Sequence, residues 1–217
     1  MATGGFGGFG DGAVEFFEGL QADNSKAYWS DHEHTYRDAV RTPMLALLAE
    51  LEPEFGPATL FRPYRDVRFA RDKSPYKTQC GAYAGSGSAA FYTHVSADGL
   101  LVAGGAYRLA PDQLARYRAA VDDERRGEDL RRRLEEAARR GLERGGDVLR
   151  TRPRGVDPDH PRLDLLRHRT LTLSRSWPPD AALHERECLD RVRTGWRAVR
   201  PLSEWFADHV GPPEPTA

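Results

Sequence analysis

Phe91–Tyr107, with the sequence FYTHVSADGLLVAGGAY, combines two apolar runs with a short turn signal between them. Phe91–Ser96 and Leu100–Tyr107 have the composition of strands, and Asp98-Gly99 separates them. An Asp-Gly pair between two such runs is typical of a tight β-hairpin. We therefore predict two adjacent antiparallel strands in this part of the chain.

Other segments extend this hairpin into a sheet. Leu60–Phe69 and Gly81–Ala84 also have an extended character, and Thr170–Arg175 is expected to add one more strand near the end of the chain. Together with the hairpin, the two earlier segments predict an antiparallel meander.

Apolar residues at helical spacing occur on both sides of the predicted sheet. A short helix is expected around Val14–Leu20, and a second one is expected to start after the stop and N-cap signal Asp23-Asn24-Ser25 and to lead into a longer helical stretch, Tyr36–Leu51. Further helices are expected from Pro111, from about Glu128 to Leu142 and from Asp180 to about Val199. The strands cluster between helical blocks and do not alternate with helices, which favours an α+β fold over a parallel βαβ repeat.

The two ends of the chain differ in composition from the middle. Residues 1–9 are rich in glycine and residues 211–217 are rich in proline, so both are expected to be flexible and outside the regular structure. Residues 10–210 contain neither an internal repeat nor a clear linker. We therefore expect a single α+β domain over 10–210, with an antiparallel sheet or meander packed against several helices.

Composition and charge limit the classes of function. The formal net charge of −1 provides no global field for a polyanion, so no nucleic-acid partner is expected. No stretch approaches the ~18 apolar residues of a membrane span, so no membrane association is expected. Cys80 and Cys188 are too few for a disulfide framework, which indicates a reducing compartment and hence the cytoplasm. The oligomeric state is left open.

The segment from Phe61 to Lys77, FRPYRDVRFARDKSPYK, is unusually cationic. Six cations against two carboxylates leave a local excess of four positive charges in a chain that is otherwise balanced. If Phe61–Phe69 is a strand, Arg65 points to the core face together with Val67, where a guanidinium needs a partner.

This charge pattern has two chemical interpretations. Arginine is suited to forked contacts with carboxylate or phosphate, so Arg65 and Arg68 could orient an oxyanion while Lys73 and Lys77 add charge at the rim of a pocket. In that pocket Asp72 could position a cation or accept a proton. Alternatively, the carboxylates of the segment and acids elsewhere neutralise the cations in a structural ion-pair network.

A family resemblance is carried by Arg65-x-x-Arg68-Phe69-x-x-Asp72-Lys73-Ser74-Pro75-Tyr76-Lys77-Thr78. This run resembles the signature of an uncharacterised family catalogued as domain of unknown function 2461. Further motifs extend the similarity over nearly the whole chain: Asn24-x-Lys26 followed by Trp29 and Tyr36, Tyr92-x-His94 with Gly104-Gly105-x-Tyr107, and Arg152-Pro153-x-Gly155-x-Asp157-Pro158-x-His160-Pro161.

The resemblance implies a single α+β domain, found mainly in bacteria and fungi, without an established family-wide activity. Some members appear alongside natural-product biosynthesis genes, so the resemblance permits a small-molecule enzyme. This chain has Asp23 where the family often has Asn, and Arg169 where it often has Lys. Both differences retain polarity or charge.

His94 shares one face of its predicted strand with Tyr92 and Ser96. If that face lines a cleft, the imidazole could act as a general acid or base near neutral pH, with Tyr76 as another proton-transfer candidate. The alternative is a strand histidine that only hydrogen-bonds to its neighbours.

Four more residues are candidates for ligand binding. The hydroxyl of Tyr107 could contact a polar ligand and Trp29 could stack on a sugar or base, although either ring can simply belong to the core or its edge. Asn24 and Lys26 stand at a predicted helix start, where anions bind but where capping alone also explains such residues.

The sequence lacks the motifs of the common cofactor enzymes: a Walker loop, a dinucleotide-binding glycine pattern, a His-Glu-x-x-His motif and a Gly-x-Ser-x-Gly elbow. His184 and Cys188 are spaced to share a helix face, but two ligands do not define a zinc site. We predict neither a cofactor nor a metal.

The sequence therefore supports two classes of function and leaves open whether the protein is an enzyme. The first is binding of a small anionic metabolite, phosphorylated or nucleotide-like, in a cationic pocket between Arg62–Lys77 and the hairpin, as in small-molecule or natural-product biosynthesis. The second is a non-catalytic protein that docks an acidic partner through the same segment. Convergence of Arg65, Arg68 and His94 on one concavity favours the first, and a flat or internally paired segment favours the second.

Overall fold

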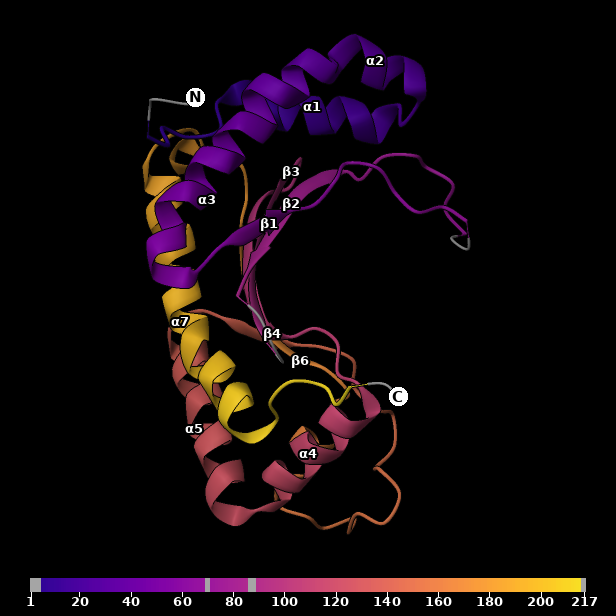
Figure 1. Cartoon of the computed structure of the whole chain (residues 1–217), viewed down its shortest axis with the longest axis vertical. Helices are drawn as coiled ribbons and strands as arrows, with labels where there is room; N and C mark the ends of the chain where they lie inside the picture. The colour runs from indigo at the N-terminus through magenta and orange to yellow at the C-terminus, as the bar shows by residue number, and fades with distance from the viewer. Residues whose placement is uncertain (1–4, 69–70, 86–88, 216–217) are drawn as a thin grey trace. The chain divides into compact units, whose positions relative to one another are not determined.

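The computed structural model describes residues 5–68, 71–85 and 89–215. These residues form an α+β fold around one six-stranded antiparallel sheet with the order β1-β2-β3-β4-β6-β5, which confirms the predicted fold class. Figure 1 labels β1 to β4 and β6 of this sheet. The strands are β1 (Ala58–Leu60), β2 (Gln79–Ala84), β3 (Ala90–Ser96), β4 (Gly99–Ala106), β5 (Glu143–Gly145) and β6 (Leu171–Trp177). The predicted meander is present as β2-β3-β4, consecutive neighbours in the sheet.

Helices precede and follow the meander along the chain, as the periodicity predicts. They are α1 (Asp11–Ala22), α2 (Lys26–Thr35), the π-helix η1 (Tyr36–Arg41), α3 (Thr42–Phe55), α4 (Pro111–Asp122), α5 (Glu124–Arg139), α6 (Leu163–Leu166), the 3-10 helix η2 (Ala181–His184) and α7 (Glu187–His209). Within the described residues, no helix combines the length and the apolar character needed to cross a membrane.

The predicted strand Leu60–Phe69 is wrong over most of its length. β1 ends at Leu60, residues 61–68 belong to no strand, and Phe69 lies outside the described residues. Pro63 has no amide hydrogen to donate to a sheet partner, which favours an interruption of the ladder there, and beyond it only an isolated bridge, among the described residues, pairs Tyr64 with Tyr76.

α5 begins earlier than predicted, at Glu124. The carboxylate of Asp123 caps the helix by accepting a hydrogen bond of 2.9 Å from the Arg126 amide. The helix also ends earlier, at Arg139, because Gly141 takes a φ of +79°, outside the helical region. The chain then forms β5, which the sequence did not predict.

α7 continues beyond Val199, its predicted end, to His209. Pro201 lies inside the helix and costs it a main-chain hydrogen bond. The side chains of Leu202 and Trp205 are buried just after it, and this burial outweighs the lost bond.

The chain divides into two compact units by its internal contacts. Unit 1 comprises Met1–Ala84, Tyr92–Val102 and Ser176–Thr194; unit 2 comprises Gly85–Phe91, Ala103–Arg175 and Gly195–Ala217. Strands β3, β4 and β6 and helix α7 contribute residues to both units. Each unit buries a set of apolar side chains of its own.

The core of unit 1 is rich in aromatic side chains. Phe16 of α1 meets Trp29 of α2 edge to face, with ring centroids 5.8 Å apart, and Trp29 lies 4.9 Å from Tyr36. α3 contacts β1 and β2, so its apolar stripe packs on the sheet as predicted. In this part of the sheet Ala58 of β1 lies opposite Ala84 of β2.

The N-terminal segment of unit 1 is packed although it contains no regular structure. Residues 5–10 are in neither a helix nor a strand, as expected, yet Phe6 and Phe9 are buried and their rings lie 5.4 Å apart. The Phe6 amide donates to Glu50 at 2.7 Å, and Glu50 also forms an ion pair with Arg186 at 2.6 Å. Residues 1–4 and 216–217, part of the predicted flexible ends, lie outside the described residues.

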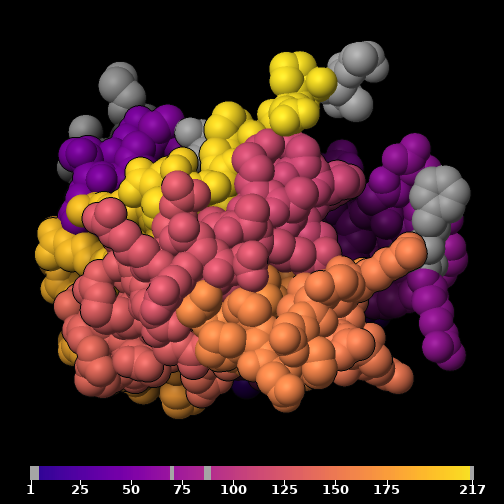
Figure 2. Space-filling view, turned by 90° about the horizontal axis from the view of Figure 1, so that it is seen from below, coloured from indigo at the N-terminus to yellow at the C-terminus, as the bar shows by residue number. Residues whose placement is uncertain are grey.

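The core of unit 2 lies among α4, α5, α6 and the second half of α7. Tyr117 of α4 stacks on Phe206 of α7 with ring centroids 5.7 Å apart, and its hydroxyl donates to the Leu165 carbonyl at 2.9 Å. Figure 2 shows one face of this unit, where α4 and α5 lie beside the segment that follows them up to residue 175.

Candidate functional site

Residues 61–78 form a segment that we call the cationic ribbon, and all but residues 69–70 of it are described. The ribbon extends from the end of β1 and returns to β2 (Figure 1). The Arg65 amide donates to the Pro75 carbonyl at 2.9 Å, and the Lys77 amide donates to the Pro63 carbonyl at 2.8 Å. These bonds hold the two arms of the ribbon side by side near its base.

Tyr76 anchors the ribbon to unit 1. Its ring stacks on Trp29, with centroids 4.3 Å apart and planes 6° from parallel. The side-chain amide of Asn24 brackets the Tyr76 backbone, accepting from its amide at 3.0 Å and donating to its carbonyl at 3.1 Å. Three sequence candidates thus come together in a cluster that positions the ribbon.

The polar residues Asn24, Ser25 and Lys26 at the start of α2 have different roles. Ser25 caps the helix by accepting a 3.1 Å hydrogen bond from the Tyr28 amide, so capping does not explain Asn24. Lys26 is exposed at the first helical position, and its ammonium makes no hydrogen bond or ion pair with the described residues. A ligand role for Lys26 stays a prediction.

Two ribbon cations are paired with the ribbon's own carboxylates. Arg65 forms an ion pair with Asp72, and Arg68 binds Asp66 through two hydrogen bonds of 3.0 and 2.7 Å. The Arg65 side chain keeps 37% of its surface exposed, because no strand carries it to a core face. It finds the partner that a guanidinium needs within the ribbon itself.

Asp72 is held by several donors at once. It accepts hydrogen bonds from the Ser74 hydroxyl at 2.6 Å and from the Ser74 amide at 2.9 Å. These bonds and the ion pair with Arg65 lower the pKa of Asp72 to about 2. A carboxylate with so low a pKa is ionised at neutral pH and is a weak proton acceptor.

The other four ribbon cations meet no carboxylate of the ribbon, since its only two are already paired. Lys73 donates to the Val67 carbonyl at 2.9 Å and Lys77 to the Arg62 carbonyl at 2.8 Å, and neutral acceptors leave both charges in place. The exposed side chains of Arg62 and Arg71 form no hydrogen bond or ion pair with the described residues. The ribbon therefore remains strongly positive after its internal pairing.

His94 lines a separate cavity of about 290 Å³ in unit 1. Its polar lining comes from neutral side chains and one carboxylate: Gln21, Thr78, Gln79, His94, Ser96, Ser176 and Asp98. Arg65, Arg68, Asp72 and Tyr76 are not among the described residues that line it. None of the ribbon cations lines this cavity, whereas Thr78 at the end of the ribbon does.

A short chain of hydrogen bonds orients the His94 ring. The Gln79 side-chain amide donates to the Tyr92 hydroxyl at 3.1 Å, and that hydroxyl lies 3.1 Å from His94 Nδ1. With its oxygen accepting from Gln79, Tyr92 can donate to Nδ1, which leaves the ring proton on Nε2. Burial lowers the pKa of His94 to about 4 despite the opposing charge of Asp98, so the ring is neutral at pH 7.

Tyr107 and the glycines before it belong to unit 2. Tyr107 is 88% exposed, and its place in a ligand site stays a prediction. A Cβ at Gly104 would lie 2.5 Å from Val199 Cγ1 and 2.8 Å from the Ala90 carbonyl oxygen. Close packing of helix and strand thus accounts for Gly104 without a ligand.

Gln79 and Tyr92 were missed as site residues by sequence reasoning. Tyr92 had a usable signal, because period-two alternation places it on the same strand face as His94. Gln79 had none, since its contact with Tyr92 spans two strands and depends on the register of the sheet.

The described residues offer few groups that could hold a metal or act as a reactive thiol. Within the described residues, no cluster of three or more His, Cys, Asp or Glu side chains could hold a metal ion. Cys80 and Cys188 are buried, and burial raises the pKa of the Cys80 thiol to about 11 and that of Cys188 to about 12. Neither thiol is a ready nucleophile at neutral pH.

Fold and site together define the class of this protein: it is an α+β protein whose clearest surface feature is an anchored cationic ribbon. The chain belongs to the family described as conserved hypothetical protein (DUF2461), whose model matches residues 12–205. This match spans nearly the whole chain and confirms the resemblance carried by the ribbon motif. Comparison with curated proteins finds no match to the chain.

Proposed function

We propose that the protein docks an acidic protein surface through the cationic ribbon. One observation carries the proposal: four ribbon cations remain without a carboxylate partner in the ribbon, and none of them lines the cavity of about 290 Å³ in unit 1 or that of about 660 Å³ in unit 2. Exposed like charges on a projecting segment attract a partner of opposite charge and raise its rate of association.

The anchoring of the ribbon supports the same function. The Trp29–Tyr76 stack and the Asn24 bracket hold the ribbon base in place before any partner arrives. A preformed surface loses less conformational entropy on binding than a segment that must first be ordered. The ion pairs Arg65–Asp72 and Arg68–Asp66 link residues within the ribbon, and the other four cations remain available to a partner.

The test uses a fluorescently labelled oligoglutamate peptide as the acidic probe. Arg62→Gln with Arg71→Gln removes two charges whose side chains make no hydrogen bond or ion pair with the described residues, so the variant should keep its fold, which circular dichroism checks. Affinity at low salt should fall by roughly fivefold, because each exposed charge pair contributes about 0.2–1 kcal/mol. The dependence of affinity on salt should also become weaker.

Arg150→Gln with Arg154→Gln is the matched control, since both side chains are exposed in unit 2 and also make no bonds with the described residues. This variant loses the same net charge and should bind like the wild type. The proposal fails if the peptide does not bind, or if both double variants weaken binding equally. Tighter, ribbon-dependent binding of a single-stranded oligonucleotide of equal charge would identify a nucleic-acid partner instead.

A second candidate function is binding of a small polar molecule in the His94 cavity. The ordered chain from Gln79 through Tyr92 to His94 favours it, because it fixes the ring and leaves Nε2–H as a donor. The lining includes Asp98 and, among the described residues, no Lys or Arg, so a neutral or cationic ligand fits better than an anion. The NMR signals of His94 are followed during titration with polyols and amines. The proposal is contradicted if these signals do not shift with any of the compounds.

A further inference from the structure

A cavity of about 660 Å³ lies along α5 in unit 2, away in sequence from every family motif discussed above. Its lining residues are Arg125, Arg126, Glu128, Asp129 and Arg132 of α5 and His209 at the end of α7. This volume falls within the roughly 300–1,000 Å³ typical of small-molecule sites. The charge that the lining presents decides which class of ligand fits.

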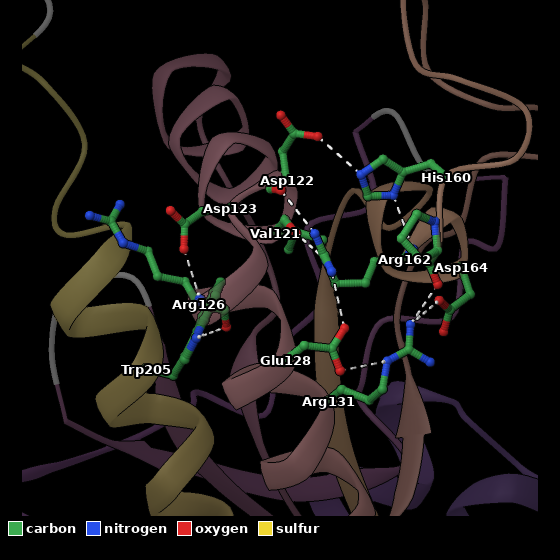
Figure 3. A network of polar contacts seen from close by, with 11 residues as sticks. Val121, Asp122, Asp123, Arg126, Glu128, Arg131, His160, Arg162, Asp164 and Trp205 are labelled. Atoms are coloured by element: carbon green, nitrogen blue, oxygen red, sulfur yellow. Dashed lines mark hydrogen bonds and ion pairs between the residues drawn. The ribbon is translucent and has the colours of Figure 1, made fainter.

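Glu128 is already engaged by two arginines outside the cavity lining. Its Oε1 accepts a hydrogen bond of 3.0 Å from Arg162, and its Oε2 lies 3.8 Å from Arg131 Nε (Figure 3). Arg131 in turn contacts Asp164 at 3.4 Å. The negative charge of Glu128 is therefore compensated by Arg162 and Arg131, which do not line the cavity.

Arg162 holds this arrangement in place from the interior. It is 5% exposed, and it donates to the Val121 carbonyl at 2.7 Å and to the Asp122 carbonyl at 2.9 Å (Figure 3). Gly127 makes room for it, because a Cβ there would lie 2.5 Å from Arg162 Nε. A buried guanidinium with this many acceptors fixes Glu128 in one orientation.

Asp129 is engaged in the same way. It accepts a 2.7 Å hydrogen bond from Arg133 and forms an ion pair with Arg132. Burial alone raises the pKa of Asp129, but the bonds from Arg133 and Arg132 outweigh it and the net pKa is lowered. Both carboxylates of the lining are thus paired with arginines.

Arg125 and Arg126 are left with uncompensated charge. Their guanidiniums form no hydrogen bond or ion pair with the described residues, and Figure 3 shows the Arg126 side chain directed away from the Arg162 network. Of the three acids just before them, Asp123 caps α5 and Asp122 bonds to His160 at 3.0 Å. The exposed Glu124 forms no ion pair with either arginine in the part of the chain that the structure describes. The lining therefore presents positive charge to a ligand.

A hydrogen bond and a ring contact join the two helices that carry these groups. The buried Trp205 indole of α7 donates to the Arg126 carbonyl at 3.0 Å, which ties α7 to the first turn of α5. His209 packs against Trp205 edge to face at 5.1 Å, so its imidazole is held at the cavity. Arg125 and Arg132, seven residues apart, lie on the same side of α5.

We propose that this cavity is a binding site for a small phosphate monoester, with Arg125 and Arg126 as the phosphate-binding residues and His209 as an additional hydrogen-bond donor. Guanidinium forks match the geometry of phosphate oxygens, and paired carboxylates in the wall do not repel the anion as free ones would. The site is independent of the cationic ribbon and of the docking function proposed for it.

The test measures the midpoint of thermal unfolding in the presence of phenyl phosphate. Inorganic phosphate and phenol, the two parts of that molecule, are measured as comparison ligands. A ligand that binds the native state raises the midpoint by mass action, and at about a hundredfold excess over its Kd it shifts the folding equilibrium about a hundredfold. Wild type should be stabilised by phenyl phosphate and not by phenol. Arg125→Gln with Arg126→Gln should weaken binding at least about tenfold, since a hydrogen bond to a charged group contributes about 1.5–3 kcal/mol.

The matched control is Arg139→Gln with Arg140→Gln, two exposed arginines on and just after the same helix, beyond the cavity. It removes the same charge and should bind phenyl phosphate like the wild type. Circular dichroism of each variant establishes that it is folded. The proposal is overturned if phenyl phosphate does not stabilise the wild type, if Arg125→Gln with Arg126→Gln retains full binding, or if the control loses as much.

Arg62→Gln with Arg71→Gln separates this site from the ribbon. That variant should bind phenyl phosphate normally while it loses affinity for oligoglutamate. Loss of phosphate binding in the ribbon variant would place the anion on the ribbon and would overturn the α5 site.

Discussion

Burial sets the protonation state of His94, the histidine that lines the cavity of unit 1. Its pKa is lowered from 6.5 to about 4 by burial, against the opposing effect of Asp98. The sequence suggested a group that transfers protons near neutral pH, because an unperturbed imidazole titrates there. In its actual environment the ring serves at pH 7 as a neutral donor and acceptor.

The depressed pKa of His94 makes stability depend on pH in a defined window. The unfolded chain takes up a proton at His94 near pH 6.5, whereas the folded chain does so only near pH 4. Stability is therefore fully present above about pH 6.5, falls as the pH is lowered and levels off near pH 4. The difference between the two pKa values corresponds to about 3 kcal/mol.

Urea unfolding of wild type and His94→Gln at several pH values measures this contribution. The difference in the free energy of unfolding between pH 7 and pH 4.5 should be smaller in the variant by up to about 3 kcal/mol. His168, whose pKa is also lowered, is present in both proteins and cancels in the comparison. Parallel curves would show that His94 titrates normally in the folded protein.

Gly99, in the turn between β3 and β4, is required both by the backbone conformation of the turn and by the close packing around it. The Asp-Gly pair predicted the hairpin because a tight turn needs a positive φ, and Gly99 takes φ +98°. The structure adds a second reason. A Cβ at Gly99 would overlap the Trp177 carbonyl oxygen and would lie 2.7 Å from the Pro178 carbonyl carbon.

Alanine substitutions at two glycines separate these effects. Gly155 also has a positive φ, of +83°, but a Cβ there meets nothing within 4 Å. Gly155→Ala should therefore cost about 1 kcal/mol for the backbone alone, and Gly99→Ala should cost at least about 3 kcal/mol because neighbouring backbone must also move. Free energies of unfolding from urea titrations provide the comparison, and equal losses would exclude the packing effect at Gly99.

The shared elements of the two units have a consequence for the unfolding of the whole molecule. β3, β4, β6 and α7 each contain residues of both units, so neither unit can unfold without disrupting elements of the other. We expect one cooperative transition, in keeping with the single domain predicted over residues 10–210. That domain organisation itself stays a prediction until such a measurement is made.

Leu47→Ala in α3 and Leu130→Ala in α5 test this expectation, since both side chains are fully buried, one in each unit. Each should lower the free energy of unfolding by about 2–5 kcal/mol. Both should shift the same midpoint, whether it is followed by circular dichroism or by tryptophan fluorescence. Two separate transitions, each sensitive to only one substitution, would contradict the prediction.

Local patterns account for most of what the sequence predicted correctly. Strand alternation, the Asp-Gly turn and helical stripes are properties of neighbouring residues, so the meander and the long helices followed from them. Where a tertiary contact opposes the local signal, the prediction was wrong: α7 passes through Pro201 because its far half is buried. The ribbon motif, being a local run, also identified the family.

The sequence by itself determined the α+β class, the meander, the surplus charge of residues 61–78 and the family, because each depends on residue type and spacing along the chain. Only the tertiary structure decided which cations are neutralised, which histidine lines a cavity and which arginines line another. These properties depend on partners far apart in sequence, such as Asn24 with Tyr76 and Arg162 with Glu128. Charge and pKa respond to distance in space, and the order of residues does not specify that distance.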